Sequence, residues 1–225
     1  MRALTAVSLV DRTLDDVLSE LTHIARDGLP GTEATSITLI RGGKAFTAAF
    51  AGEVSLKADE MQYERGYGPC LDAGRAGLVF IVDDMRTEQR WPDYARHVTE
   101  LGVLSSLSVP LPFQGETVGA LNNYSSEPRA FGDEAVRLGE EVAALIAVAV
   151  ANADALARAS DAAANMQAAM RSRAVIEQAK GILMERHKVT ADDAFGLLTR
   201  ASQRTNTKLR DISEELCRTG LLPGA

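Results

Sequence analysis

The sequence has few of the residues from which covalent frameworks and catalytic or metal centres are built. Its 225 residues include two cysteines, three histidines and one tryptophan. Cys70 and Cys217 lie far apart, which argues against a disulfide framework and indicates free thiols in a reducing compartment. The histidines are scattered without metal-ligand spacing, and no serine–histidine–aspartate or paired-carboxylate pattern stands out. We therefore expect neither a metal site nor an enzyme.

Long hydrophobic stretches are also lacking. The longest apolar run, residues 142–151, has ten residues, whereas a membrane-spanning helix needs about 18 or more. No secretory leader pattern stands at the N-terminus. We expect a cytoplasmic protein without a membrane partner.

Charge is distributed unevenly along the chain. Residues 171–225 contain ten Lys or Arg against seven Asp or Glu, a net charge of +3, and residues 1–170 carry −10. A locally basic segment on an acidic chain is compatible with nucleic-acid contact at one end, because phosphates are neutralised by nearby cations. The alternative is that these are ordinary solvated surface charges.

Residues 171–220 predict three short helices that share a small core. In the first, Ile176, Ala179 and Leu183 fall on one face, with Met184 beside them. Residues 190–193 have the form of a capping box that opens the second helix. The expected core positions of the second and third helices are Ala194, Leu197, Leu198, Ala201, Leu209, Ile212 and Leu216.

Three further predictions concern single positions in this segment. Gly181 lies inside a predicted helix, which suggests a close packing contact there. The helical phase of Phe195, the one aromatic residue in 171–225, places it in the core, which argues against base stacking on an exposed aromatic ring. Asn206, or Thr207 after it, is expected to cap the third helix.

The order of these residues resembles the ANTAR family of RNA-binding modules in bacterial transcription antiterminators. The resemblance runs from about Arg171 to Gly220. It includes the residues 179–183 (Ala-Lys-Gly-Ile-Leu), Ala194-Phe195, Leu197-Leu198, Ser202, Asn206, Lys208-Leu209 and Asp211-Ile212. It implies a homodimer that binds tandem hairpin loops in a nascent leader RNA. Cys217 and Arg218 depart from the aliphatic residues that the family more often has there.

The candidate RNA-binding residues are the clustered cations and one glycine. Small residues such as Ala179 and Gly181 would allow close approach of the RNA. The full set is Arg173, Lys180, Gly181, Arg200, Arg204, Lys208 and Arg210.

Residues 13–125 predict a largely antiparallel sheet flanked by helices. Residues 13–16 form a second capping-box pattern, followed by apolar residues at helical spacing. Strands are expected at 36–40, 45–51, 78–82, 107–111 and 117–124, joined in part by tight turns. Strand pairs joined in this way favour an α+β fold over a repeated βαβ unit.

The motifs of this region resemble the GAF family of small-molecule sensor domains, over about residues 4–155. They are Gly68-Pro69-Cys70-Leu71-Asp72-Ala73, Arg90-Trp91-Pro92, Val109-Pro110-Leu111 and Val118-Gly119-Ala120-Leu121-Asn122. The family fold implies a six-stranded antiparallel sheet with helices on one face and a ligand pocket on the other. The candidate pocket residues are Met61, Tyr63, Cys70, Trp91 and Tyr94, and the sequence does not identify the ligand or a cofactor.

Some GAF domains reduce free methionine sulfoxide with cysteine thiols. Cys70 is the only cysteine of this region, so the resolving cysteine which that chemistry usually needs is missing. The sensor role is therefore favoured over the reductase.

One long helix is expected to join the two modules, since residues 133–187 contain no proline. Apolar residues recur there in alternating steps of four and three, which predicts a coiled-coil seam. The seam positions are Leu138, Val142, Leu145, Ala149, Asn152, Leu156, Ala159, Ala163, Met166 and Met170. The alternative is that this face packs on the sheet as far as about Leu156, with pairing between chains only after it.

The sequence thus predicts a sensor domain at 1–155, a connecting helix over 133–170 that overlaps it, and an RNA-binding module at 171–225. The function that follows is a signal-responsive, RNA-binding transcription antitermination regulator that acts as a homodimer. The alternative is a sensor or protein-interaction module whose C-terminal segment only dimerises.

Overall fold

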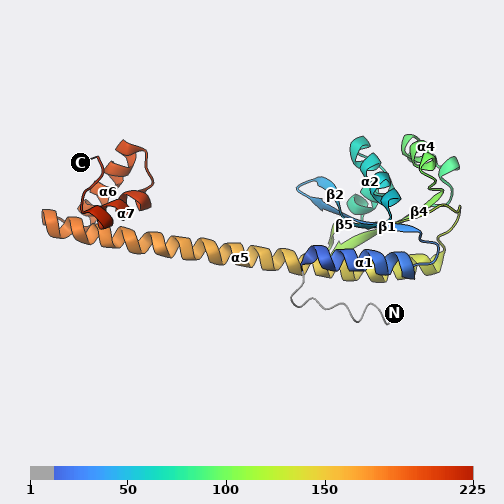
Figure 1. Ribbon diagram of the computed structural model, residues 1–225, viewed down its shortest axis with the longest axis horizontal. Coiled ribbons are helices and arrows are strands. Elements are labelled where there is room, and N and C mark those ends of the chain that lie inside the picture. Colours follow the sequence, from blue (N-terminus) through green and yellow to red (C-terminus); the bar gives the residue numbers. More distant parts are fainter. Residues whose placement is uncertain (1–12, 225) are drawn as a thin grey trace. The chain divides into compact units, whose positions relative to one another are not determined.

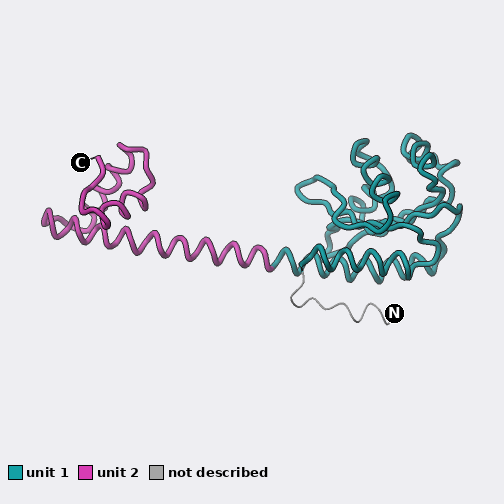
Figure 2. Tube along the Cα trace, viewed as in Figure 1, with its two compact units in different colours: residues 1–155 teal, residues 156–225 magenta. Residues whose placement is uncertain are grey.

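The computed structural model describes residues 13–224, so the part of the expected sensor domain before Thr13, and residue 225, lie outside the described residues. The chain divides into two compact units, residues 1–155 and 156–225 (Figure 2).

The first unit contains a five-stranded antiparallel sheet in the order β2-β1-β5-β4-β3. The strands are β1 (Ala34–Arg41), β2 (Lys44–Ala51), β3 (Phe80–Val82), β4 (Ser105–Phe113) and β5 (Glu116–Ser125). Gly42 and Gly43 both have positive φ, the backbone that a tight two-residue hairpin between β1 and β2 requires. The five predicted strands are confirmed, and the sixth strand of the family fold is absent from residues 13–224.

Helices cover both faces of the sheet rather than one (Figure 1). On one face, apolar side chains at alternate strand positions, including Ile37 and Leu121, pack on α1 (Leu14–Gly28) and the first half of α5 (Asp133–His187). The Thr13–Asp16 capping box that opens α1 is confirmed. The opposite face lies under α2 (Glu53–Arg65), α3 (Pro69–Ala76) and α4 (Pro92–Glu100), and a short 3₁₀ helix, η2 (Met85–Thr87), precedes α4.

Helix α5 is continuous over 55 residues, as expected. Val142 and Ala149 of the predicted seam are buried against the sheet, so the alternative of packing on the sheet holds for them. The large apolar residues that stay exposed on the same helix are Leu145, Val148, Leu156, Met166 and Met170. The sheet packs on the face of α5 that includes Val142, Ile146 and Val150.

By length and composition, α5 is the one helix of residues 13–224 that could cross a membrane. Its apolar composition has another explanation, since Val142, Ala143, Ile146, Ala147 and Val150 fill the core beneath the sheet.

The second unit packs the end of α5 against α6 (Ala191–Thr205) and α7 (Leu209–Thr219). The buried core is formed by Ala179, Leu183, Ala194, Leu198, Ala201, Ile212 and Leu216. Thr190 and Asp193 form the expected capping box at the start of α6. Leu197 and Leu209 are only partly buried at the margin of this core.

Three local expectations for this unit were wrong. Phe195 is 44% exposed, because it follows the core residue Ala194 by about 100° around the helix and the small core buries a narrow stripe. Asn206 ends α6 in the left-handed conformation, and Lys208 occupies the start of α7 without a side-chain cap. Ala179 is fully buried in the core and cannot face an RNA.

Candidate functional sites

A buried polar cluster lies between the sheet and α2–α4 in the first unit. Its centre is Asp59 of α2, whose side chain is fully buried. The Tyr124 hydroxyl donates to Asp59 Oδ1 at 2.6 Å, and Thr47 Oγ1 donates to Asp59 Oδ2 at 2.9 Å. Asn122 Nδ2 donates weakly to Oδ1 at 3.4 Å. Two strands, β2 and β5, thus supply the donors that hold this carboxyl group.

The cluster continues from β1 towards α3. Thr38 Oγ1 lies 2.8 Å from the Tyr63 hydroxyl and 3.1 Å from Cys70 Sγ. The Tyr63 hydroxyl also lies 2.9 Å from Thr47 Oγ1, so it is held by both β1 and β2. Tyr63 and Cys70, two of the predicted pocket residues, therefore share one hydrogen-bond network.

Gln62 links the cluster to the start of α3. Its Oε1 accepts from the Cys70 backbone N–H at 2.9 Å, and its Nε2 donates to the hydroxyls of Tyr94 and Tyr124 at 3.3 and 3.4 Å. A Cβ on Gly68 would lie 2.3 Å from Gln62 Oε1, and Gly68 has φ 147°. Glycine is therefore required there for the side chain of Gln62 to cap α3.

Burial dominates the electrostatics of the cluster. It raises the pKa of Asp59 to about 6, although hydrogen bonds from Tyr124, Ser36, Thr47 and Thr38 act in the opposite direction. No described Lys or Arg forms an ion pair with this carboxyl group. Burial, with Asp59 nearby, also raises the pKa of Cys70 well above its usual value, so the thiol stays protonated at neutral pH.

Three buried polar atoms on this face of the sheet have no partner among the described residues. They are Ser106 Oγ, Ser108 Oγ and Asn122 Oδ1. Ser108 pairs with Asn122 across β4 and β5, and Ser106 pairs with Tyr124, so the three side chains are neighbours. Buried groups of this kind ordinarily bind water or a ligand. These three atoms therefore have unused hydrogen-bonding capacity.

The structure separates the five predicted pocket residues. Tyr63, Cys70 and Tyr94 belong to the cluster, whereas Met61 is only partly buried and packs on the apolar residues around α4. Trp91 donates from Nε1 to Asp72 Oδ2 at 2.7 Å and packs edge-on against Phe80, with the Arg90 guanidinium 4.5 Å from its ring centre. Its role is to join α3 and α4.

The residues that sequence reasoning missed are Asp59, Gln62, Thr38, Asn122 and Tyr124. A signal for the strand residues was present, since Ser36 and Thr38 alternate with Ile37 and Leu39.

Four of the predicted RNA-binding cations of the second unit are exposed and form no ion pair with any described residue. They are Arg173, Arg200, Arg204 and Lys208. Lys180 lies 2.9 Å from Glu177 and is largely covered, and Arg210 lies 3.0 Å from Asp211. The free cations therefore come mainly from α6 and the turn after it.

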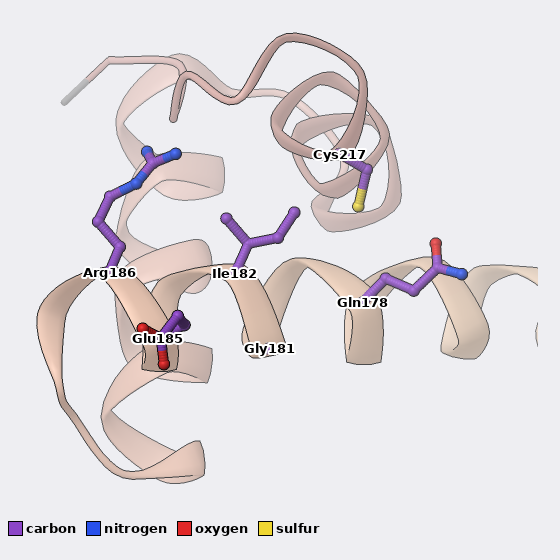
Figure 3. A pocket seen from close by; sticks show the side chains of 6 residues that line it. All are labelled: Gln178, Gly181, Ile182, Glu185, Arg186 and Cys217. Carbon is purple, nitrogen blue, oxygen red and sulfur yellow. The ribbon is translucent and has the colours of Figure 1, made fainter.

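A groove of about 810 Å³ lies between α5 and α7 (Figure 3). Six residues line it: Gln178, Gly181, Ile182, Glu185, Arg186 and Cys217. Arg186 donates to the Gly220 carbonyl oxygen at 2.6 Å.

Gly181 is exposed, and a Cβ placed on it would meet no atom within 4 Å. The expected packing contact is therefore absent within the described residues, while a glycine inside a helix costs about 1 kcal/mol relative to alanine.

The two units define a class of protein in which a small-molecule-sensing fold precedes a helical nucleic-acid-binding module. The chain belongs to the GAF domain family, whose model matches residues 11–151, and an ANTAR domain follows at residues 164–216. At the family level it is a signal-responsive RNA-binding regulator. None of the curated proteins matches the chain.

Solved structures support the fold of the first unit. The GAF domain of a phosphoenolpyruvate-protein phosphotransferase from Coxiella burnetii is 20% identical, with a TM-score of 0.54, over 70% of this chain and 91% of that one. The phycocyanobilin-bound GAF domain of a cyanobacterial phytochrome is 23% identical, with a TM-score of 0.53, over 68% and 92%. A GAF domain of Synechocystis in its photoproduct state is 16% identical, with a TM-score of 0.54, over 65% and 98%.

Proposed function

We propose that the protein is a homodimeric transcription antitermination regulator that binds hairpin loops in nascent leader RNA in the cytoplasm. The observation that carries this proposal is the set of exposed, unpaired cations on the ANTAR unit. Arg200 and Arg204 lie four residues apart on α6, and so share a face, while Phe195 exposes its ring on the same helix. Cations suit loop phosphates, and an exposed ring suits stacking on an unpaired base.

The double substitution Arg200→Ala and Arg204→Ala is expected to weaken binding to a two-hairpin leader RNA roughly tenfold or more. The loss of two phosphate contacts would also reduce the slope of log K against log salt concentration by about 1 to 2. Fluorescence anisotropy across a salt series measures both quantities. A matched control is Arg26→Ala with Arg137→Ala, which removes the same charge from the GAF unit.

The preference for the leader RNA over a loop-scrambled RNA should persist in the Arg26→Ala, Arg137→Ala control. It should fall in the Arg200→Ala, Arg204→Ala variant. Equal binding of both RNAs by the wild type would instead support the alternative of a protein-interaction module.

The dimer is proposed to form through the part of α5 that leaves the sheet. Leu156, Met166 and Met170 are each at least 65% exposed, and a run of alanines lies between the leucine and the methionines. A second copy of the same helix would cover these side chains, since apolar residues at this spacing pack in a coiled coil.

Replacing Met166 and Met170 with lysine is expected to give a monomer. Affinity for a two-hairpin RNA should then fall to that for a single hairpin, because the avidity of two linked modules is lost. Light scattering gives the mass, and helicity by circular dichroism serves as the folding control. A variant that remains dimeric would place the interface elsewhere.

The GAF unit is proposed to act as a sensor and not as an enzyme. The buried, protonated thiol of Cys70 supports this proposal, because it is poorly suited to attack a substrate. The unpartnered atoms of Ser106, Ser108 and Asn122 are where a signal molecule would bind. Because a ligand shifts only an equilibrium between states that it binds differently, we propose that it biases the packing of α5 on the sheet.

A further inference from the structure

We propose that the groove between α5 and α7 receives an unpaired base that is extruded from the RNA loop. This inference rests on the proposed RNA-binding function and adds to it a site of defined chemistry. In this arrangement the cations of α6 contact phosphates, and the groove contacts one base.

Gly181 is the first reason. It stands inside a continuous helix, where glycine is unfavourable, and a Cβ placed on it would meet no atom within 4 Å. Intramolecular packing therefore does not account for the glycine. A partner that approaches the helix backbone more closely than a Cβ allows would account for it.

The chemistry of the walls is the second reason. Ile182 provides an apolar surface in the groove, and the Cys217 thiol, with its pKa raised by burial, is an uncharged wall. The Gln178 side chain is exposed beside them, as Figure 3 shows, and its amide offers both a donor and an acceptor to a base edge. An apolar floor with a bifunctional amide suits a planar base.

Of the two charged side chains that line the groove, only Glu185 has an ion-pair partner among the described residues. Glu185 lies 2.5 Å from Lys188, and the Arg186 guanidinium donates to the Gly220 carbonyl. Arg186 is thus a cation at the groove without an ion pair, and it is available to the phosphate of the nucleotide whose base enters the groove. Its volume, about 810 Å³, falls within the range of about 300–1,000 Å³ that is typical of small-molecule sites. An unpaired base, with its own phosphate at Arg186, is the occupant that we assign to this groove.

The test is an abasic scan of the RNA loop with the full-length protein and its Gly181→Leu variant. Each loop nucleotide is replaced in turn by an abasic residue, and affinity is measured by fluorescence anisotropy. Leucine favours the helix and fills the groove, so the variant should melt no lower than the wild type.

We expect one loop position at which base removal weakens binding by the wild type at least tenfold and leaves binding by the Gly181→Leu variant unchanged. Gly28→Leu makes the same change at an exposed glycine of α1 in the GAF unit, where a Cβ would also meet no atom within 4 Å, and should keep the wild-type pattern.

If base removal at every loop position weakens binding by the wild type and by the Gly181→Leu variant equally, the proposed base site is wrong. The RNA-binding function is then unaffected. Absence of loop-selective binding by the wild type itself would overturn the proposed function together with this site. The measurement on the wild type alone therefore shows whether the RNA-binding function or only the base site is wrong.

Discussion

Replacing Asp59 with asparagine is expected to remove most of the change in stability of the GAF unit between pH 4 and pH 8. The wild-type carboxyl group is fully buried, and its pKa is raised to about 6 from 3.8 because burial disfavours its charged form. A difference of about two pKa units corresponds to about 3 kcal/mol between the two protonation states. This is a large fraction of the stability of a domain of this size.

The direction of the effect follows from the raised pKa. Between about pH 4 and pH 6 the folded state keeps the Asp59 proton, which the unfolded chain loses, so stability falls as pH rises. Above about pH 6, ionisation of Asp59 causes no further loss of stability. Below about pH 4, Asp59 is protonated in both the folded and the unfolded state and does not change the free energy of unfolding. The neighbouring hydroxyl groups of Tyr63, Tyr94 and Tyr124 and the Cys70 thiol all have raised pKa values and remain neutral throughout this range.

Urea unfolding of wild type and Asp59→Asn at each pH measures the difference. Between pH 4 and pH 8 the free energy of unfolding of the wild type should fall by about 3 kcal/mol relative to that of the variant. Asp15→Asn, on the exposed part of α1, is the matched control and should show no such gain. Parallel pH curves for wild type and Asp59→Asn would show that the carboxyl group reaches water or binds a cation in solution.

Replacing Leu183 with alanine is expected to unfold the ANTAR unit and leave the GAF unit folded. Leu183 is fully buried in a core of only seven buried residues, none of them aromatic. Loss of a buried leucine costs about 2–5 kcal/mol, which is comparable with the whole stability of a unit of this size. The change in helix propensity is negligible, so the effect measures packing.

Calorimetry should show that one transition is lost or strongly lowered while the other keeps its midpoint, and RNA binding should disappear. Leu221→Ala makes the same chemical change at a side chain that is 72% exposed and should alter neither. A single transition that shifts as a whole would mean that the two units unfold cooperatively.

The elements that could be predicted from the sequence are those specified by local patterns. The capping boxes at Thr13 and Thr190 and the glycine pair of the β1–β2 hairpin depend on residues within a few positions of one another. The proline-free stretch of α5 is likewise a local property. Several functional side chains escaped prediction because their positions depend on distant contacts. Asp59 lies in α2, a helix with little separation of apolar and polar faces, and its partners Thr47, Asn122 and Tyr124 come from two strands.

Helical periodicity also predicted the wrong buried residues where two adjacent faces of a helix could each enter the core. Phe195 and Ala194 are one residue apart, and only the packing of α5 and α7 decides that the alanine enters the core. The same holds for α5, where the sheet takes Val142 and Ala149 from the predicted seam.

The amino-acid sequence by itself determined the family, the order of the two modules, the continuous helix between them and the basic character of the C-terminal unit. These properties follow from motif order, spacing and composition, which are readable along the chain. Only the tertiary structure decided which cations are free, which polar groups surround Asp59, and that Gly181 borders an open groove. Each of these depends on burial and on contacts between segments distant in sequence, and burial exists only once the chain is packed.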